Sequence, residues 1–131
     1  MKIPIHISEE SREPIYHQVE TQIKTLIVSG QLPPGTSLPS IRALAGDLGC
    51  SVITTRRAYQ NLEANGFIKT AQGKGTFVND VENRKIEDTK EKLAYDAFKK
   101  AVEHGIQVGC SEEEINTIFN NIMREYFKNG G

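Results

Sequence analysis

Hydrogen-bonding and cationic side chains gather in one short stretch near the middle of the chain, where Ser51, Thr54, Thr55, Arg56 and Arg57 stand within seven residues. Such side chains can donate to the base edges and phosphates of DNA, and the free N–H groups of a helix that starts here would bind a phosphate. A polar first turn is equally typical of a solvated helix face. The cluster therefore needs a second feature before it indicates nucleic-acid binding.

A lysine between two glycines provides that second feature. Gly73-Lys74-Gly75 combines a cation with residues that allow a backbone to approach another surface closely. Glycines in a hairpin also serve turn geometry alone. Arg42, further upstream, would point toward a duplex backbone or stay solvated. In this order and spacing, the features together predict a nucleic-acid-binding surface.

The charge of the chain is unevenly distributed. The formal net charge of the whole chain is −1. Residues 40–79 nevertheless hold five basic and two acidic residues, whereas residues 80–131 hold eight basic and eleven acidic ones. A cationic segment can attract a polyanion even when the whole protein is nearly neutral.

The remaining reactive side chains form no recognisable catalytic, metal or nucleotide site. The three histidines lack metal-ligand spacing, and neither cysteine lies in a CxxC or Cys/His cluster. The run Glu112–Glu114 fits a first helical turn, where negative charge complements the helix dipole. We therefore expect no enzyme activity, no metal and no cofactor, and we expect Cys50 and Cys110 to be buried.

Three helices and a hairpin are predicted to position the cationic residues. Apolar residues recur at steps of three and four between a proline and a glycine over residues 14–30, which indicates a helix. Ser40 caps a short second helix that ends at Gly49, and Ser51 caps a third that ends at an Asn-Gly pair. Residues 67–78 contain two β-prone runs around a glycine-rich turn, which predicts a hairpin.

Two further elements are predicted at the ends of this region. Ile3, Ile5 and Ile7 alternate with other residues, which indicates a short strand that Pro4 restricts to a sheet edge. Residues 80–89 are polar and charge-rich, and we interpret them as a linker.

A pair of amphipathic helices is predicted for the C-terminal tail. The first runs from about Lys90, and the second follows Ser111, whose partner Glu114 completes a capping box. The two helices cannot cover both of their apolar stripes alone, so we expect a four-helix assembly in a homodimer. The predicted dimerisation residues are Leu93, Ala97, Phe98, Ala101, Ile115, Ile118, Phe119, Ile122 and Tyr126.

The predicted fold is mainly α with a small β-hairpin wing. We expect an N-terminal winged helix-turn-helix in residues 1–79, a linker in residues 80–89 and a C-terminal two-helix dimerisation hairpin in residues 90–131. No apolar run approaches the roughly 20 residues that a bilayer span needs, and the N-terminus lacks a signal-peptide pattern. A cytoplasmic location without a membrane partner is therefore expected.

The run from Leu32 to Val78 closely resembles the DNA-binding domain of the GntR family of regulators. The motifs that carry the resemblance are PGxxLPSxR and the wing sequence QGKGTFV. The opening sequence PIYHQV and the short tail resemble the small YtrA-type branch of that family. The resemblance implies a repressor of a small operon, such as a transport operon, that binds a palindromic operator as a homodimer.

The resemblance also implies individual contacts with double-stranded operator DNA. Arg42 and Arg56 would each contact a phosphate or a base. Ser51 and Thr54 would line the groove that the helix enters, and Gly75 would lie in the minor groove. The full predicted DNA-binding set is Arg42, Ser51, Val52, Thr54, Thr55, Arg56, Arg57, Lys74 and Gly75.

Val52 departs from the family pattern, because many relatives have arginine at this position. One polar contact is therefore either lost or replaced by a contact with a thymine methyl group. Ile41 stands where relatives often have glutamate. The operator of another family member consequently cannot be transferred to this chain.

Two other interpretations remain open on the residues alone. A winged helix can also bind protein or RNA, and salt-dependent duplex binding separates that alternative from operator binding. An enzyme would require a clustered catalytic set, which the sequence lacks. A tail this short leaves little room for an enclosed pocket, so a small-molecule effector would bind between subunits or between the tail and the DNA-binding domain.

Overall fold

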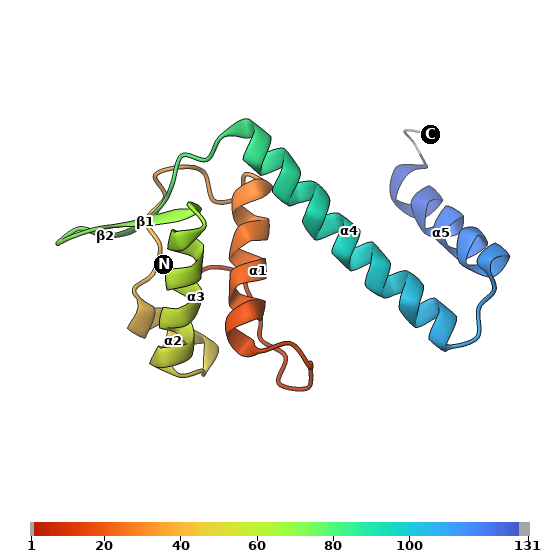
Figure 1. Cartoon of the computed structure of the whole chain (residues 1–131), viewed down its shortest axis with the longest axis horizontal. Coiled ribbons are helices and arrows are strands. Elements are labelled where there is room, and N and C mark those ends of the chain that lie inside the picture. The colour runs from red at the N-terminus through yellow and green to blue at the C-terminus, as the bar shows by residue number, and fades with distance from the viewer. Residues whose placement is uncertain (1, 129–131) are drawn as a thin grey trace. The chain divides into compact units, whose positions relative to one another are not determined.

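The computed structural model describes residues 2–128, which form five helices and one hairpin. The elements in chain order are α1 (Ile15–Val28), α2 (Ile41–Leu48), α3 (Val52–Ala64), β1 (Ile68–Ala71), β2 (Gly75–Val78), α4 (Asn83–Gln107) and α5 (Glu112–Phe127) (Figure 1). The chain divides into two compact units, Met1–Leu93 and Ala94–Gly131, which we call the head unit and the tail unit.

The core of the head unit lies where α1 and α2 pack on α3. Val19 and Ile23 of α1, Leu44 of α2, and Ala58 and Leu62 of α3 are each at most 1% exposed. Their spacing places each set on one face of its helix, as the sequence pattern predicts. This packing fixes α3 against two other helices and leaves its remaining faces open.

The helix-turn-helix is shaped by three capping interactions. Ser40 Oγ accepts a hydrogen bond from the Ala43 N–H at 3.1 Å at the start of α2. Gly49 ends α2 with φ +70°, a left-handed conformation that glycine adopts without a Cβ clash. Ser51 then caps α3 by accepting from the Thr54 N–H at 3.0 Å. The predicted caps Ser40, Gly49 and Ser51 are thus confirmed.

The hairpin is the predicted wing, and its base is tied to the helices. β1 and β2 pair antiparallel from Ile68 opposite Val78 to Ala71 opposite Gly75. The Leu38 N–H donates to the Thr76 carbonyl at 2.8 Å, which joins the segment before α2 to β2. Figure 1 shows the hairpin extending away from the three helices.

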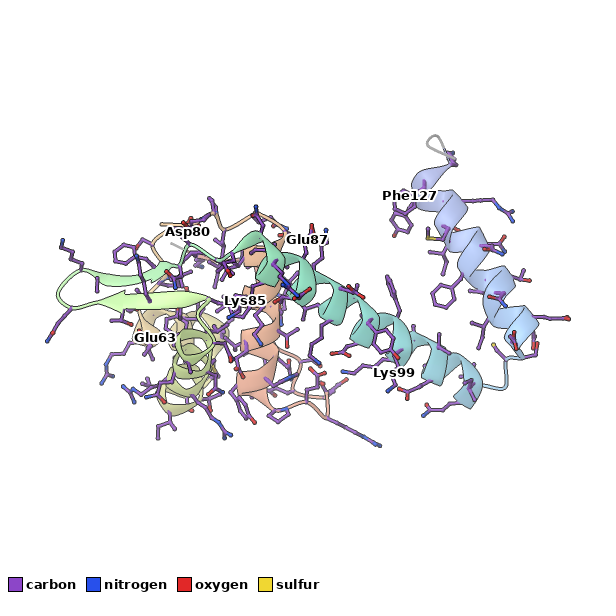
Figure 2. The ribbon with its side chains drawn as sticks, turned by 45° about the horizontal axis from the view of Figure 1, so that its top comes forward. Glu63, Asp80, Lys85, Glu87, Lys99 and Phe127 are labelled. Atoms are coloured by element: carbon purple, nitrogen blue, oxygen red, sulfur yellow. The ribbon has the colours of Figure 1, made fainter. Side chains whose placement is uncertain are left out.

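A second tie joins the wing to α3. Glu63 Oε2 accepts from the Thr70 N–H of β1 at 3.1 Å, and Glu63 is labelled on α3 in Figure 2. The wing and α3 are therefore linked through a side chain as well as through the chain itself.

The predicted N-terminal strand is wrong. Residues 2–7 form no strand, although Ile3 and Ile5 are buried in the core as the alternation suggested. The backbone of this N-terminal segment bonds, at His6 and Ser8, to glutamine side chains of α1 instead of to a neighbouring strand. Gln22 accepts from the His6 N–H at 2.8 Å and donates to the His6 carbonyl at 2.6 Å.

Gln18 repeats this clamp one turn earlier on α1. Its side chain accepts from the Ser8 N–H at 2.8 Å and donates to the Ser8 carbonyl at 3.0 Å. Gln18 is only 7% exposed, and these bonds satisfy an amide that burial would otherwise penalise. The N-terminal segment is thus held on the head unit without forming a sheet.

Helix α4 begins at Asn83, seven residues before the predicted start at Lys90, so most of the predicted linker is helical. Ile86 packs against the core of the head unit. Lys85 donates to the Asn65 carbonyl, and its Nζ lies 4.8 Å from the centroid of the Phe67 ring (Figure 2). These few contacts hold the first turns of α4, which a polar sequence pattern does not reveal.

The predicted pair of helices consists of α4 and α5, and the short turn that joins them lies in the tail unit. Ser111 Oγ accepts from the Glu114 N–H at 3.1 Å, and Glu114 Oε1 accepts from the Ser111 N–H at 2.8 Å, which confirms the predicted capping box. A methyl group on Gly105 would lie 3.3 Å from the Ile115 side chain. The two helices therefore approach each other closely near the turn.

Both cysteines differ from their expected burial, because Cys50 and Cys110 are each partly exposed thiols. Cys50 Sγ lies 3.3 Å from Thr55 Oγ1, within weak hydrogen-bond distance. Among residues 2–128, no helix combines the length and the apolar composition that crossing a bilayer requires. The same residues contain no group of three or more His, Cys, Asp or Glu side chains placed to hold a metal ion.

Tyr59 of α3 allows a test of the packing between α2 and α3, the two helices of the helix-turn-helix. Its side chain is 4% exposed, and its hydroxyl donates to the Pro39 carbonyl, just before α2, at 2.7 Å. Burial raises the pKa of Tyr59, so the hydroxyl keeps its proton. Tyr59→Phe is expected to lower the free energy of unfolding by about 1 kcal/mol, measured by urea denaturation, because the carbonyl loses its donor.

The matched control is Tyr95→Phe, which changes a tyrosine that is 64% exposed and should leave the free energy of unfolding unchanged. Equal stability of the wild type and Tyr59→Phe would show that the hydroxyl does not stabilise the packing of α2 against α3.

Candidate nucleic-acid interface

The N-terminal tip of α3 presents hydroxyl groups and unpaired backbone donors. Ser51 Oγ donates to Thr54 Oγ1 at 2.8 Å while it accepts from the Thr54 N–H. The N–H groups of Val52 and Ile53 lie in the first turn, where no carbonyl of the helix can accept from them. The positive end of the helix dipole is at the same place. The tip can therefore bind an anionic group of a ligand such as a phosphate.

Thr55 lies inside the head unit and not on this tip surface. Its side chain is 0% exposed, and Thr55 Oγ1 donates to the Ser51 carbonyl at 3.1 Å. Its hydroxyl is thus satisfied within α3. A direct contact between Thr55 and DNA, which the sequence predicted, would require an accessible side chain, whereas Thr55 is buried.

The two adjacent arginines of α3 have different surroundings. Arg56 is exposed, and the described residues offer it no hydrogen bond or ion pair. Arg57 Cζ lies 3.8 Å from the centroid of the Tyr16 ring on α1. Stacking of this kind stabilises the packing of one helix against the other. Arg56 is therefore available to a ligand, whereas Arg57 is engaged within the head unit.

The wing carries the other predicted contacts. Lys74 and Gly75 are both exposed at the end of the hairpin. Gly75 has φ +109°, and a Cβ placed on it would meet no heavy atom within 4 Å. Open space beside the backbone permits close approach to a surface, as the sequence suggested. Arg42 is exposed in the first turn of α2.

The exposed cations of this region lack ionic partners among residues 2–128. His17 Nδ1 lies 3.6 Å from Glu13 Oε2, and Lys90 Nζ lies 2.8 Å from Glu87 Oε2, but all four residues are far from the tip of α3 in sequence. The free cations are Arg42, Arg56, Lys69 and Lys74. Uncompensated positive charge on one small unit attracts a polyanion and concentrates it near the surface.

Sequence reasoning missed Ile53 as a surface residue of the tip. It is 77% exposed at the second position of α3, whereas Val52 beside it is half-buried. The buried face of α3 carries Thr55, Ala58, Tyr59 and Leu62. Residue 53 lies about 200° around the helix from residue 55, which is the signal that could have placed it on the open face.

The predicted dimerisation residues lie on α4 and α5, and none of them is buried. Phe98, Ile118 and Tyr126 are 62%, 49% and 78% exposed. Ala97, Ala101 and Ile122 are also exposed, whereas Leu93, Ile115 and Phe119 are half-buried. Phe127 is also 62% exposed, at the end of α5 (Figure 2). The described part of the tail unit thus carries much uncovered apolar surface.

The head unit defines the class of protein. A helix-turn-helix followed by a wing, with free cations on the second helix and on the wing, is the DNA-binding module of transcription regulators.

Comparison with known proteins gives the same class. The model of the family described as bacterial regulatory proteins, gntR family, matches residues 15–78. The HTH-type transcriptional repressor YtrA of Bacillus subtilis (strain 168) is 30% identical over 112 residues, which cover 86% of each chain. The chain belongs to the GntR family, in its small YtrA-type branch, and is a DNA-binding transcription regulator.

Solved structures of similar proteins share the fold. A GntR family transcriptional regulator from Listeria monocytogenes superimposes with a TM-score of 0.69 at 29% identity, over 86% of this chain and 97% of its own. YtrA from Sulfolobus acidocaldarius, a GntR-family transcription factor, gives a TM-score of 0.57 at 39% identity, over 72% of this chain and 97% of its own. The predicted winged helix-turn-helix followed by a helical tail is thereby confirmed.

The adjacent arginines of α3 allow a matched test of binding against stability. Arg57→Ala is expected to lower the free energy of unfolding by about 0.5–1 kcal/mol, because Tyr16 loses its stacking partner. Arg56→Ala should leave stability unchanged and weaken binding to a selected duplex by about 1–3 kcal/mol. Urea denaturation and fluorescence anisotropy measure the two effects. Equal binding by wild type and Arg56→Ala would remove Arg56 from the interface.

Proposed function

We propose that this regulator acts in the cytoplasm as a repressor that binds a palindromic operator as a homodimer. The single observation that carries the proposal is the set of free cations at the tip of α3 and on the wing of one compact unit. The tip would enter the major groove, with Ser51, Thr54 and Arg56 near base edges and phosphates. Lys74 and Gly75 would approach the minor groove, and Arg42 would contact the backbone. The similarity to a repressor supports repression as the outcome.

The tail supports the dimer in this proposal. We assign DNA binding to residues 1–79 and dimerisation to residues 90–131, with residues 80–89 as the connection. Phe98, Ile118 and Tyr126 would be covered by the same surface of a second copy, which gives a two-fold assembly. A two-fold dimer presents two tips to two halves of a palindrome. A small-molecule effector would act by changing the separation of these tips.

The proposed function is tested by selection of bound sequences from random DNA duplexes. We expect an enriched palindrome with half-sites separated by about one helical turn, or a multiple of it, because each subunit reads one half. Recovery of no preferred sequence at moderate ionic strength would contradict the proposal. Binding of single-stranded RNA with higher affinity than any duplex would favour the alternative of an RNA-interaction module.

The wing contact predicts a change in salt dependence. Lys74→Ala should weaken binding to all duplexes alike and lower the slope of log affinity against log salt concentration by about one for each subunit, and so by about two for the homodimer, because each subunit loses one phosphate contact. The measurement is anisotropy titration over a series of salt concentrations. Lys99→Ala, in the exposed tail (Figure 2), is the control and should leave the slope unchanged. An unchanged slope for Lys74→Ala would place the wing away from the DNA.

The dimer predicts a change of mass on disrupting the tail. Ile122→Glu places a charge in the proposed interface and is expected to shift the sedimenting species from twice the chain mass toward 14.6 kDa. Thr117→Glu changes an exposed residue outside the apolar stripe of α5 and should sediment like the wild type. Circular dichroism checks that both variants keep their helices. A wild type that sediments as a monomer at micromolar concentration would contradict the dimer.

A further inference from the structure

Ile53 is an apolar side chain without an intramolecular partner surface. It is 77% exposed, and among residues 2–93 it is the only isoleucine, leucine, valine, methionine or aromatic side chain in the exposed class. All other large apolar residues of this range are buried or half-buried. Packing within the head unit therefore covers, fully or in part, every large apolar side chain of residues 2–93 except Ile53 at the tip of α3.

The position of Ile53 is fixed by the way α3 begins. The Ser51 cap sets the first turn, and the buried residues Ala58 and Leu62 set the rotation of the helix about its axis. With both fixed, a side chain at position 53 cannot turn into the core. Exposure of Ile53 thus follows from the fold and is not a result of a loose terminus.

The neighbours of Ile53 on the open face are the polar groups of the proposed interface. Arg56 lies three residues further along α3, a spacing that places two side chains side by side on a helix surface. Thr54 follows Ile53 directly. Ile53 is thus an apolar group within a surface that otherwise donates hydrogen bonds.

Resting on the proposed function, we infer that Ile53 determines operator sequence by contacting the C5-methyl group of a thymine. An isoleucine side chain can neither donate to a phosphate nor accept from a base. The thymine methyl is the apolar group that base pairs present in the major groove, where the tip of α3 would lie. Each half-site therefore contains a thymine beside the position that Arg56 contacts.

The test removes the methyl group without changing base pairing. In the duplex recovered by selection, thymines are replaced one position at a time by deoxyuridine, in both half-sites together. At one of these positions, replacing thymine by deoxyuridine is expected to lower wild-type affinity about fourfold per half-site. This change corresponds to about 0.8 kcal/mol for one buried methyl-sized group. Ile53→Ala should bind the thymine duplex more weakly and bind the thymine and deoxyuridine duplexes equally.

Val52→Ala and Arg56→Ala are the matched controls, because both change neighbours of Ile53 and should keep the preference for thymine over deoxyuridine. Urea denaturation verifies that Ile53→Ala is as stable as the wild type, as expected for an exposed side chain.

The outcomes separate this inference from the proposed function. If selection yields an operator but no deoxyuridine position weakens binding, the inference is wrong and operator binding stands. If Val52→Ala abolishes the thymine preference and Ile53→Ala keeps it, Val52 is the reader and the assignment of Ile53 is wrong. If no operator is recovered, the proposed function fails and the inference fails with it.

Discussion

The burial of one face of α3 is the constraint on which the rest of the head unit depends. Ala58 and Leu62 are fully buried against the other helices, and Tyr59 is anchored by a hydrogen bond to the Pro39 carbonyl. A close-packed face of this kind has one low-energy arrangement, so it fixes both the position and the rotation of the helix. The opposite face is then presented to solvent with a defined set of side chains, including Arg56 and Ile53.

The same constraint extends from α3 to the wing. Glu63, near the C-terminal end of α3, accepts from the Thr70 backbone in β1, and the segment before α2 bonds to β2. The helix tip and the hairpin are therefore two projections of one packed body rather than independent segments. Preorganisation of this kind reduces the ordering that binding would otherwise require. Under the proposed function, the tip and the wing would then contact adjacent grooves of DNA without prior rearrangement of the head unit.

Local signals in the sequence predicted most elements, and non-local contacts account for the errors. The serine caps and the glycine that ends α2 act within a few residues, so pattern reading finds them. The N-terminal segment is held by side chains of Gln18 and Gln22, ten or more residues away, which no period-2 pattern can reveal. The early start of α4 likewise depends on Ile86 and Lys85 meeting the head unit.

In the candidate site, too, local signals were found in the sequence and non-local contacts were not. Sequence identified the stretch that forms the tip but not the direction of each side chain, because a short cluster of polar residues covers every side of a helix. The fixed orientation of α3 about its axis places Thr55 in the core, Arg57 over the Tyr16 ring and Ile53 on the exposed face. A prediction that assigned the apolar stripe first, and then read residues on the opposite side, would have separated these roles.

The two units differ in how their stability arises, and this difference bears on regulation. The head unit buries a continuous set of side chains, whereas residues 94–128 of the tail unit include no buried residue. A helical hairpin of this size exposes too much apolar surface to be stable on its own. Under the proposed dimer, the order of the tail would depend on association, and its stability would vary with protein concentration. Sequence discrimination would then be a property of each head unit, and affinity for a palindrome would be set by the tail through the linkage of two heads.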